Sequence, residues 1–192
     1  MDVVETLLEH ETPESLTVDL VLAASSVSKG SLYHHFDDFS DLIETVLVNL
    51  FVKSVDENII AIRKIISRSR RLEELFAGLK QITEITQHHA RRATRFRRAR
   101  LVALAESRPR LMAKMAKEQS RLTAGYVALF EICQQRGWFN ASFSPRAAAV
   151  FVQAYTLGKI IDDVTEDQMD PEEWDALILQ IVDRVFVAHR PS

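Results

Sequence analysis

The stretch VSKGSLYHHF, residues 27–36, gathers side chains that can bind anions. It holds two hydroxyls, one phenol, two imidazoles and the ammonium group of Lys29. Such groups bind phosphate oxygens and set the register of a helix on DNA, while one or two side chains contact base edges. Lys29 is, however, the only Lys or Arg in the first fifty residues. The stretch therefore predicts a nucleic-acid contact with little positive charge.

The net charge of −3 hides a strong asymmetry along the chain. Residues 1–50 carry one base and ten acids, and residues 51–110 carry fifteen bases and six acids. Within the basic part, HHARRATRFRRAR aligns Arg91, Arg95 and Arg98 at helical spacing. Three interpretations stay open: a solvated helix face, a surface that docks on the acidic N-terminal segment, and a site for a polyanion or an anionic ligand.

Other candidate chemistries are weak. His88 and His89 are neighbours that point about 100° apart on a helix, so a core or pocket role is predicted and no metal site. Cys133 is predicted to be a buried small residue rather than a redox sensor. The acids of residues 162–170 are expected in a solvated turn that matches no calcium loop. No Gly-rich phosphate loop, nucleophile elbow or catalytic carboxylate pair occurs, so neither an enzyme nor a cofactor is expected.

The composition favours an all-α protein. Gly and Pro number five each, which leaves little punctuation for a many-stranded sheet. A single cysteine, no basic-then-apolar leader and no uncharged apolar run of about 20 residues predict a soluble cytoplasmic protein without membrane contact.

Hydrophobic periodicity predicts the helices. A short first helix ends before Pro13, Thr17 caps a second, and Ser28 caps a third whose Leu32 and Phe36 face inward. The second and third helices about a tight turn make a helix-turn-helix. One long helix of about eight turns follows from Asp37. Further helices are expected near 71–88, 90–106, 109–136, 145–164 and 171–188, with Ser144-Pro145, Asp170-Pro171 and Gly137 marking ends.

The last two predicted helices are apolar almost all the way round. One face of each can pack on its own domain, which leaves another to be covered. The simplest solution is a four-helix bundle with a second copy of the chain, and the alternative is that both helices are buried within one domain. The residues expected to make the dimer contact are Phe151, Tyr155, Ile161, Trp174, Leu177, Ile181 and Val185.

The stretch TVDLVLAASSVSKGSLYHHF, followed by a long helix, resembles the DNA-binding domain of the TetR family of bacterial transcriptional regulators. The C-terminal segments GKIIDD and DPEEWDALI are similar to the tails of many members. The resemblance follows the helix order along the whole chain. It implies an all-helical homodimer, with residues 1–45 as the helix-turn-helix domain and residues 46–192 as the ligand-binding and dimerisation domain. The matching residues are Thr17, Val18, Val21, Ala24, Val27, Ser28, Gly30, Leu32, Tyr33, His35 and Phe36.

The resemblance also implies roles for single residues. Thr17 and Ser28 would contact phosphates, Lys29 and Ser31 would approach bases or phosphates beside Gly30, and Tyr33 and His34 would bind the DNA backbone. A small-molecule pocket is implied between the helices of the middle region. Its candidate lining residues are Phe76, His89, Phe96, Met115, Tyr126 and Phe130.

Some residues depart from the family pattern. Ser26 stands where a turn glycine is expected, and Phe39 stands where a phosphate-binding lysine is usual, with Asp37, Asp38 and Asp41 around it. The basic arm common before the first helix is either truncated or absent. Because a specific DNA binder neutralises on the order of 6 to 10 phosphates, one lysine per subunit predicts weak, salt-sensitive DNA binding or none.

Two functions are therefore carried forward. The first is a dimeric repressor that binds operator DNA and is released by an unidentified small molecule. The second is a TetR-fold sensor or interaction protein whose grip on DNA is weak or lost.

Overall fold

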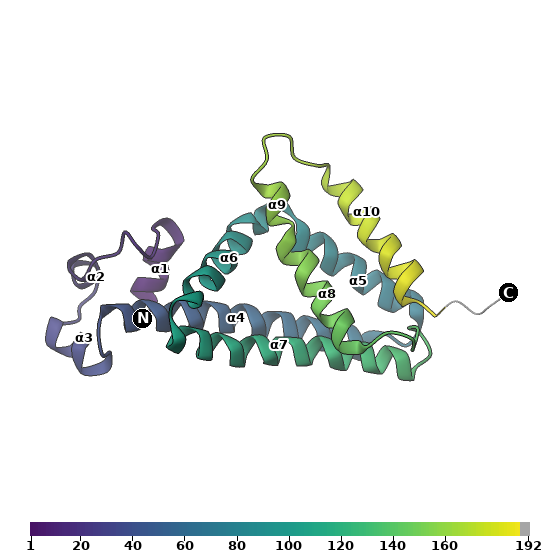
Figure 1. Ribbon diagram of the computed structural model, residues 1–192, viewed down its shortest axis with the longest axis horizontal. Coiled ribbons are helices and arrows are strands. Elements are labelled where there is room, and N and C mark those ends of the chain that lie inside the picture. Colours follow the sequence, from purple (N-terminus) through teal and green to yellow (C-terminus); the bar gives the residue numbers. More distant parts are fainter. Residues whose placement is uncertain (189–192) are drawn as a thin grey trace.

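A computed structural model of the chain describes residues 1–188, and its regular structure is helical apart from one isolated β-bridge between Phe139 and Val187. This confirms the predicted all-α class. Among these residues, no helix is both long and apolar enough to span a membrane. A small N-terminal group of helices lies at one end of the molecule, and a larger helical body holds the rest (Figure 1).

The N-terminal group consists of α1 (Asp2–His10), α2 (Val18–Ala24) and α3 (Lys29–His35), packed on the start of α4 (Phe39–Arg68). Both predicted caps are confirmed. The Thr17 hydroxyl accepts the Leu20 N–H at 3.2 Å, and the Ser28 hydroxyl accepts the Ser31 N–H at 3.2 Å. The core that holds these helices together comprises Val4, Leu8, Leu16, Val21, Leu32, Leu42, Ile43 and Val46.

In the turn between α2 and α3, Ser26 does not adopt the left-handed conformation expected of a turn glycine. Helix α2 ends at Ser25 in an extended conformation with φ −119°, and no non-glycine residue within 1–188 has a positive φ. The chain therefore bends differently from a turn that relies on glycine.

Helix α4 is one unbroken helix of 30 residues, as predicted, and it belongs to both parts of the molecule. Val46 packs in the N-terminal core, whereas Val48, Phe51 and Val55 pack in the next core along the helix. Val46, the first residue of the predicted second domain, thus still packs in the N-terminal core, and the division at residues 45 and 46 stays a prediction. The end of the predicted second domain, residues 189–192, lies outside the described residues.

The larger body is a triangle of helices with α4 along its base (Figure 1). Helices α5 (Leu72–Gln87) and α6 (Arg92–Glu106) slope from opposite ends of α4 to an apex, where the short 3-10 turn η1 (His89–Arg91) joins them. Helix α7 (Pro109–Gln135) runs beside α4, and α8 (Pro145–Gly158) crosses the triangle to α9 (Ile160–Asp163) at the apex. The last helix, α10 (Pro171–Ile181), continues as a wider π turn, η2 (Val182–Phe186).

The predicted helix ends hold, but two predicted helices were too long. Ser144 and Asp170 cap helices that begin with proline, and Gly137 follows α7 with φ +69°. The predicted helix 145–164 is divided by a turn at Lys159, which directs Asp163 to α6. The predicted helix 171–188 ends early because its last residues bond to the loop after α7: the Asn140 N–H donates to the Phe186 carbonyl at 2.7 Å.

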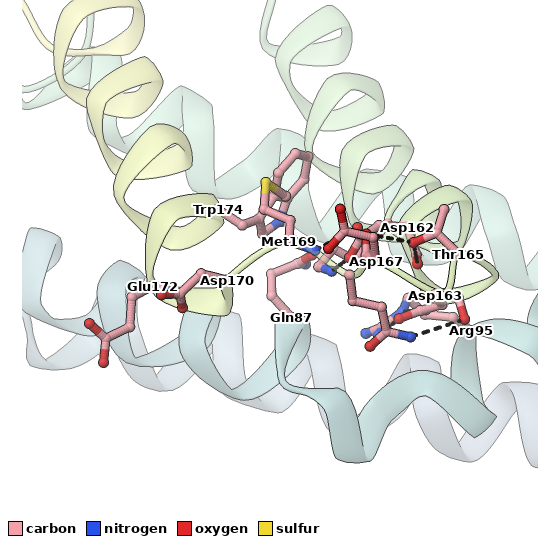
Figure 2. Close-up of polar contacts among 12 residues, drawn as sticks. Gln87, Arg95, Asp162, Asp163, Thr165, Asp167, Met169, Asp170, Glu172 and Trp174 are labelled. Atoms are coloured by element: carbon pink, nitrogen blue, oxygen red, sulfur yellow. Dashed lines mark hydrogen bonds and ion pairs between the residues drawn. The ribbon is translucent and has the colours of Figure 1, made fainter.

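A buried ion pair closes the apex of the triangle (Figure 2). Arg95 donates to both carboxylate oxygens of Asp163, from Nε at 2.5 Å and from Nη2 at 2.7 Å, and both residues are at most 4% exposed. The remaining terminal nitrogen of Arg95 donates to the Thr86 carbonyl at 3.2 Å. The prediction of a solvated helix face was therefore wrong for Arg95, and the prediction of a solvated turn was wrong for Asp163. Arg95 thus joins α5, α6 and α9 at one point.

Further polar contacts secure the same corner (Figure 2). The indole N–H of Trp174 on α10 donates to the amide oxygen of Gln87 at 3.0 Å. Asp162 accepts the Met169 N–H at 3.0 Å and pairs with Lys159. The first bond connects α10 to the end of α5, and the others hold the loop after α9 and the end of α8 to α9.

Ion pairs also join the two parts of the molecule. Arg110 pairs with Asp37 at 3.0 Å, Arg108 with Glu44 at 3.3 Å, and Lys114 with Asp41 at 3.5 Å. Opposite charges of the two segments thus meet at Arg108 and Arg110, but the docking predicted for Arg91, Arg95 and Arg98 is not found among the described side chains. The contacts lie at the start of α7 rather than on the arginine run of α6.

Asp163→Asn is expected to lower the free energy of unfolding by about 3–5 kcal/mol, because it leaves the buried Arg95 guanidinium without a counter-charge. Chemical denaturation monitored by circular dichroism measures this. The control is Asp167→Asn in the exposed part of the same loop, which should change stability by less than about 0.5 kcal/mol. Equal stabilities of the two variants would contradict the role given to the ion pair.

Candidate functional site

The seven residues predicted to contact DNA are all exposed: Thr17, Ser28, Lys29, Gly30, Ser31, Tyr33 and His34. Six of them lie on α3 or its cap, and Thr17 caps α2. Among the side chains that the structure describes, neither Lys29 nor Tyr33 has a hydrogen bond or ion pair. A Cβ at Gly30 would meet only the Ser28 hydroxyl, 4.0 Å away. Helix α3 thus presents an open polar face whose hydroxyl, phenol and ammonium groups are free to bind phosphate.

The acids beside this face are largely engaged. Asp38 caps α4 by accepting the Asp41 N–H at 2.8 Å, and Asp37 and Asp41 pair with Arg110 and Lys114 of α7. The Arg110–Asp37 pair is about three-quarters exposed, so it contributes little to stability. Its effect is electrostatic, because each cation offsets one of the negative charges that would oppose a DNA phosphate.

An interior cavity lies inside the triangle. Its innermost part measures about 50 Å³ and is mostly apolar, with Ile62, Leu79 and Val152 in its wall beside the predicted Tyr126 and Phe130. A second part of about 190 Å³ shares Asn58 and Tyr126 with it and extends toward α6. An outer groove of about 290 Å³ between α4 and α6 continues to the surface. The groove shares Ser54 and Arg98 with the second part, so the three spaces adjoin one another, and together they are called the passage.

The other predicted pocket residues lie outside this passage. Phe76 packs against the core around the inner cavity, and Met115 belongs to the neighbouring core under α6. His89 is exposed on η1, and Phe96 is half-buried with the Arg92 guanidinium 5.5 Å from its ring. Only Tyr126 and Phe130 of the six are brought together at the cavity. The candidates were chosen by residue type, and residue type alone does not show which face of a helix points into the cavity.

Arg98 is the residue that the pocket prediction missed. It lines both the second part of the cavity and the outer groove. Burial lowers the pKa of its guanidinium, because it removes water from the charged group. Arg98 donates to the Gln119 amide oxygen at 3.0 Å and lies 5.6 Å from the Phe51 ring. No carboxylate lies within 4 Å of it among the described side chains. The sequence offered one signal for this position: Arg98 lies three residues after Arg95, so the two side chains share a face of the helix.

Two phenols face the same interior. Burial raises the pKa of Tyr126 to about 12, and the nearby Arg98 charge partly counteracts this. Burial also raises the pKa of Tyr155, although hydrogen bonds to Thr83 and Thr156 oppose the shift. Tyr126 makes no hydrogen bond within the described residues. Its hydroxyl therefore stays protonated at neutral pH and can donate to a bound molecule.

The residues described contain no group of three His, Cys, Asp or Glu side chains that could hold a metal ion. His88 uses its ring nitrogen to accept the Ala90 N–H at 3.1 Å, so it caps η1. The predicted core or pocket role was wrong for His88 and His89, because both are exposed where the chain turns at the apex.

No protein-family model matches the sequence, and no curated protein matches it. Solved structures do match over almost the whole chain. A TetR-family transcriptional regulator from Mesorhizobium loti superimposes with a TM-score of 0.72 at 14% identity, over 95% of this chain and 90% of that one. GusR of Salmonella enterica gives 0.68 at 18% identity, over 94% and 89%. A transcriptional regulator from Saccharomonospora viridis, solved with choline, gives 0.72 at 10% identity, over 98% and 95%.

The chain has the TetR-regulator fold. This agrees with the resemblance of the helix-turn-helix residues, and the agreement extends through the larger helical body.

The C-terminal helices of this TetR fold leave an apolar face exposed. Phe151 on α8 is 40% exposed, Leu177 on α10 is 48%, Val185 is 53%, and Ile161 is 74%. The other residues predicted at a dimer contact, Tyr155, Trp174 and Ile181, pack against the core of their own chain. The Phe151 ring lies 5.9 Å from the ring of the buried Phe186, so α8 and η2 are in contact beside these exposed residues.

Cys133 is expected to resist alkylation in the native protein. It is 1% exposed, and burial raises the pKa of its thiol to about 12 from 9.0, so its thiolate fraction at pH 8 is about a thousandfold smaller than that of an ordinary thiol. Iodoacetamide labelling followed by mass spectrometry measures the rate. Ser107→Cys in a Cys133→Ala background supplies an exposed thiol as reference. Equal labelling rates would show that Cys133 is reactive.

Proposed function

We propose that this protein is a ligand-responsive transcriptional regulator that binds operator DNA as a homodimer. The observation that carries the proposal is the free polar face of α3, with unpartnered Lys29 and Tyr33, on a chain that has the TetR-regulator fold throughout. We further propose that it is a cytoplasmic repressor rather than an enzyme, and that a small molecule in the interior cavity releases it from DNA.

The spacing of the two α3 helices in a dimer explains how a ligand would release the protein from DNA. Two recognition helices of a dimer bind successive major grooves about 34 Å apart, so a ligand lowers DNA affinity if it favours a dimer with another spacing. Helix α6 lies between α8 and the N-terminal helices (Figure 1), and Arg108, two residues after its last residue, caps α7 and contacts Glu44 of α4. A change in the position of α6 can therefore reach α4 and the DNA-binding face.

The second candidate, a sensor or interaction protein with weak or lost DNA binding, is favoured by the single cation on α3 and by Phe39. Phe39 is half-buried against the N-terminal core and offers no charge to a phosphate. The ion pairs of Asp37 and Asp41 with cations of α7 argue against this second candidate, because they reduce the negative charge near the exposed face of α3.

DNA binding is expected to be sequence-selective at about 50 mM salt and to depend on Lys29. Lys29→Ala should make the slope of log affinity against log salt shallower by about 2 for the dimer, because each lost phosphate contact removes about 0.9. Binding to the DNA that flanks the gene of this protein, measured over a series of salt concentrations, gives both the affinity and its salt dependence.

Lys64→Ala, an exposed lysine in the distal half of α4, is the matched control and should leave affinity and slope unchanged. Absence of selective binding at about 50 mM salt would favour the sensor over the DNA-binding regulator.

Leu177→Arg is expected to break the dimer. It places a charge in the proposed apolar contact of both copies and should raise the dissociation constant of the dimer at least about a hundredfold. Analytical ultracentrifugation measures this. Ile60→Arg makes the same change at another exposed apolar residue, 64% exposed on α4, and should leave a dimer. Dimers that persist in Leu177→Arg would place the contact elsewhere.

A further inference from the structure

We propose that the interior cavity takes an organic carboxylate, whose head pairs with Arg98 and whose apolar part enters the space beside Tyr126. The proposal deepens the function proposed above by naming the ligand class of its cavity. It concerns binding alone, so it can be tested without DNA.

The guanidinium of Arg98 is the first support. It is partly desolvated, and its one hydrogen bond, at 3.0 Å, goes to the neutral amide oxygen of Gln119. That amide is itself held in place, since Gln119 donates to Gln153 at 2.6 Å. A guanidinium has five donors, and a carboxylate accepts two of them side by side. Arg98 therefore retains donors for an anion that the described part of the chain does not supply.

The charge balance of the passage is the second support. Arg95 is neutralised by Asp163, and Lys53 at the outer groove pairs with Glu5. The charged side chains that remain along the second part of the cavity and the groove are three arginines against the single carboxylate of Glu57. The arginines are Arg91, Arg97 and Arg98. The passage therefore attracts anions and disfavours cations.

The wall beyond Arg98 is the third support. Tyr126 lines both the inner cavity and the second part, and its hydroxyl has no partner within the described residues. Ile62, Leu129 and Val152 continue the wall inward. A charged head at Arg98 can thus accept a hydrogen bond from Tyr126 while an alkyl or aryl group lies on apolar side chains. The limited volume fits an acid of a few carbons to medium length.

Calorimetric titration with three probes of equal length tests the class. Hexanoate should bind saturably, and hexanol and hexylammonium should bind at least tenfold more weakly, because neither carries a negative charge to pair with Arg98. Within the series from butanoate to octanoate, each added methylene should tighten binding up to about fourfold until the cavity is filled. Hexanol that binds as tightly as hexanoate, or hexanoate that does not bind, would overturn the proposal.

Arg98→Gln should weaken hexanoate binding about 10- to 150-fold and leave hexanol binding unchanged. Arg100→Gln on the same helix is exposed, lies outside the three spaces of the passage, and should bind hexanoate like the unchanged protein. Tyr126→Phe, which removes only the hydroxyl, should weaken hexanoate binding several-fold. If Arg98→Gln does not fold, the three-probe comparison on the unchanged protein still decides.

The DNA assay separates this inference from the function on which it rests. Carboxylate binding without release of DNA would sustain the ligand class and contradict ligand-induced release. Release of DNA by a neutral or cationic molecule, with no carboxylate bound, would sustain the regulator and contradict the ligand class.

Discussion

The buried pair of Arg95 and Asp163 is the contact on which the second domain depends. Removing two charges from water costs several kcal/mol each, and this cost is offset only when the geometry is good and the remaining donors are used. Both conditions hold, since Arg95 binds both carboxylate oxygens and a carbonyl of α5. The pair also sets the rotation of α6. Residues three apart share a helix face, so Arg98 faces the interior while Arg97 and Arg100 remain exposed.

Helix α6 is therefore anchored at both ends and charged in the middle. Its first turns are held at the apex by Arg95, and its far end leads to Arg108, which contacts Glu44 of α4. A ligand can shift an equilibrium only through contacts that differ between two states. Arg98 lies between the two anchors and faces the cavity, so a contact made there acts on the same helix that touches the start of α4.

Sequence patterns predicted the helices well because caps and periodicity are local. Thr17, Ser28, Ser144 and Asp170 each accept a backbone N–H within three residues, so nothing distant is needed to foresee them. The candidate pocket was foreseen poorly because the face that a helix turns inward depends on contacts with residues remote in the sequence. Arg95 reads as part of a solvated run until Asp163, 68 residues later, is brought beside it. Of the residues predicted at a dimer contact, tertiary packing alone separates those that stay exposed from those that pack inward.

The opposite charges of the first and second parts of the chain also find a physical account. Asp41 is a half-buried acid at the start of α4, and without Lys114 its charge would oppose a DNA phosphate at full strength. In these ion pairs, Lys114 and Arg110 are engaged by carboxylates of the same chain. The two cations therefore offset acidic side chains and do not release counterions from DNA phosphates. In the proposed function, DNA affinity would then come mainly from hydroxyl, phenol and amide donors on α3. Such donors are directional, and they make recognition depend more on the fit of the dimer to the groove than on charge.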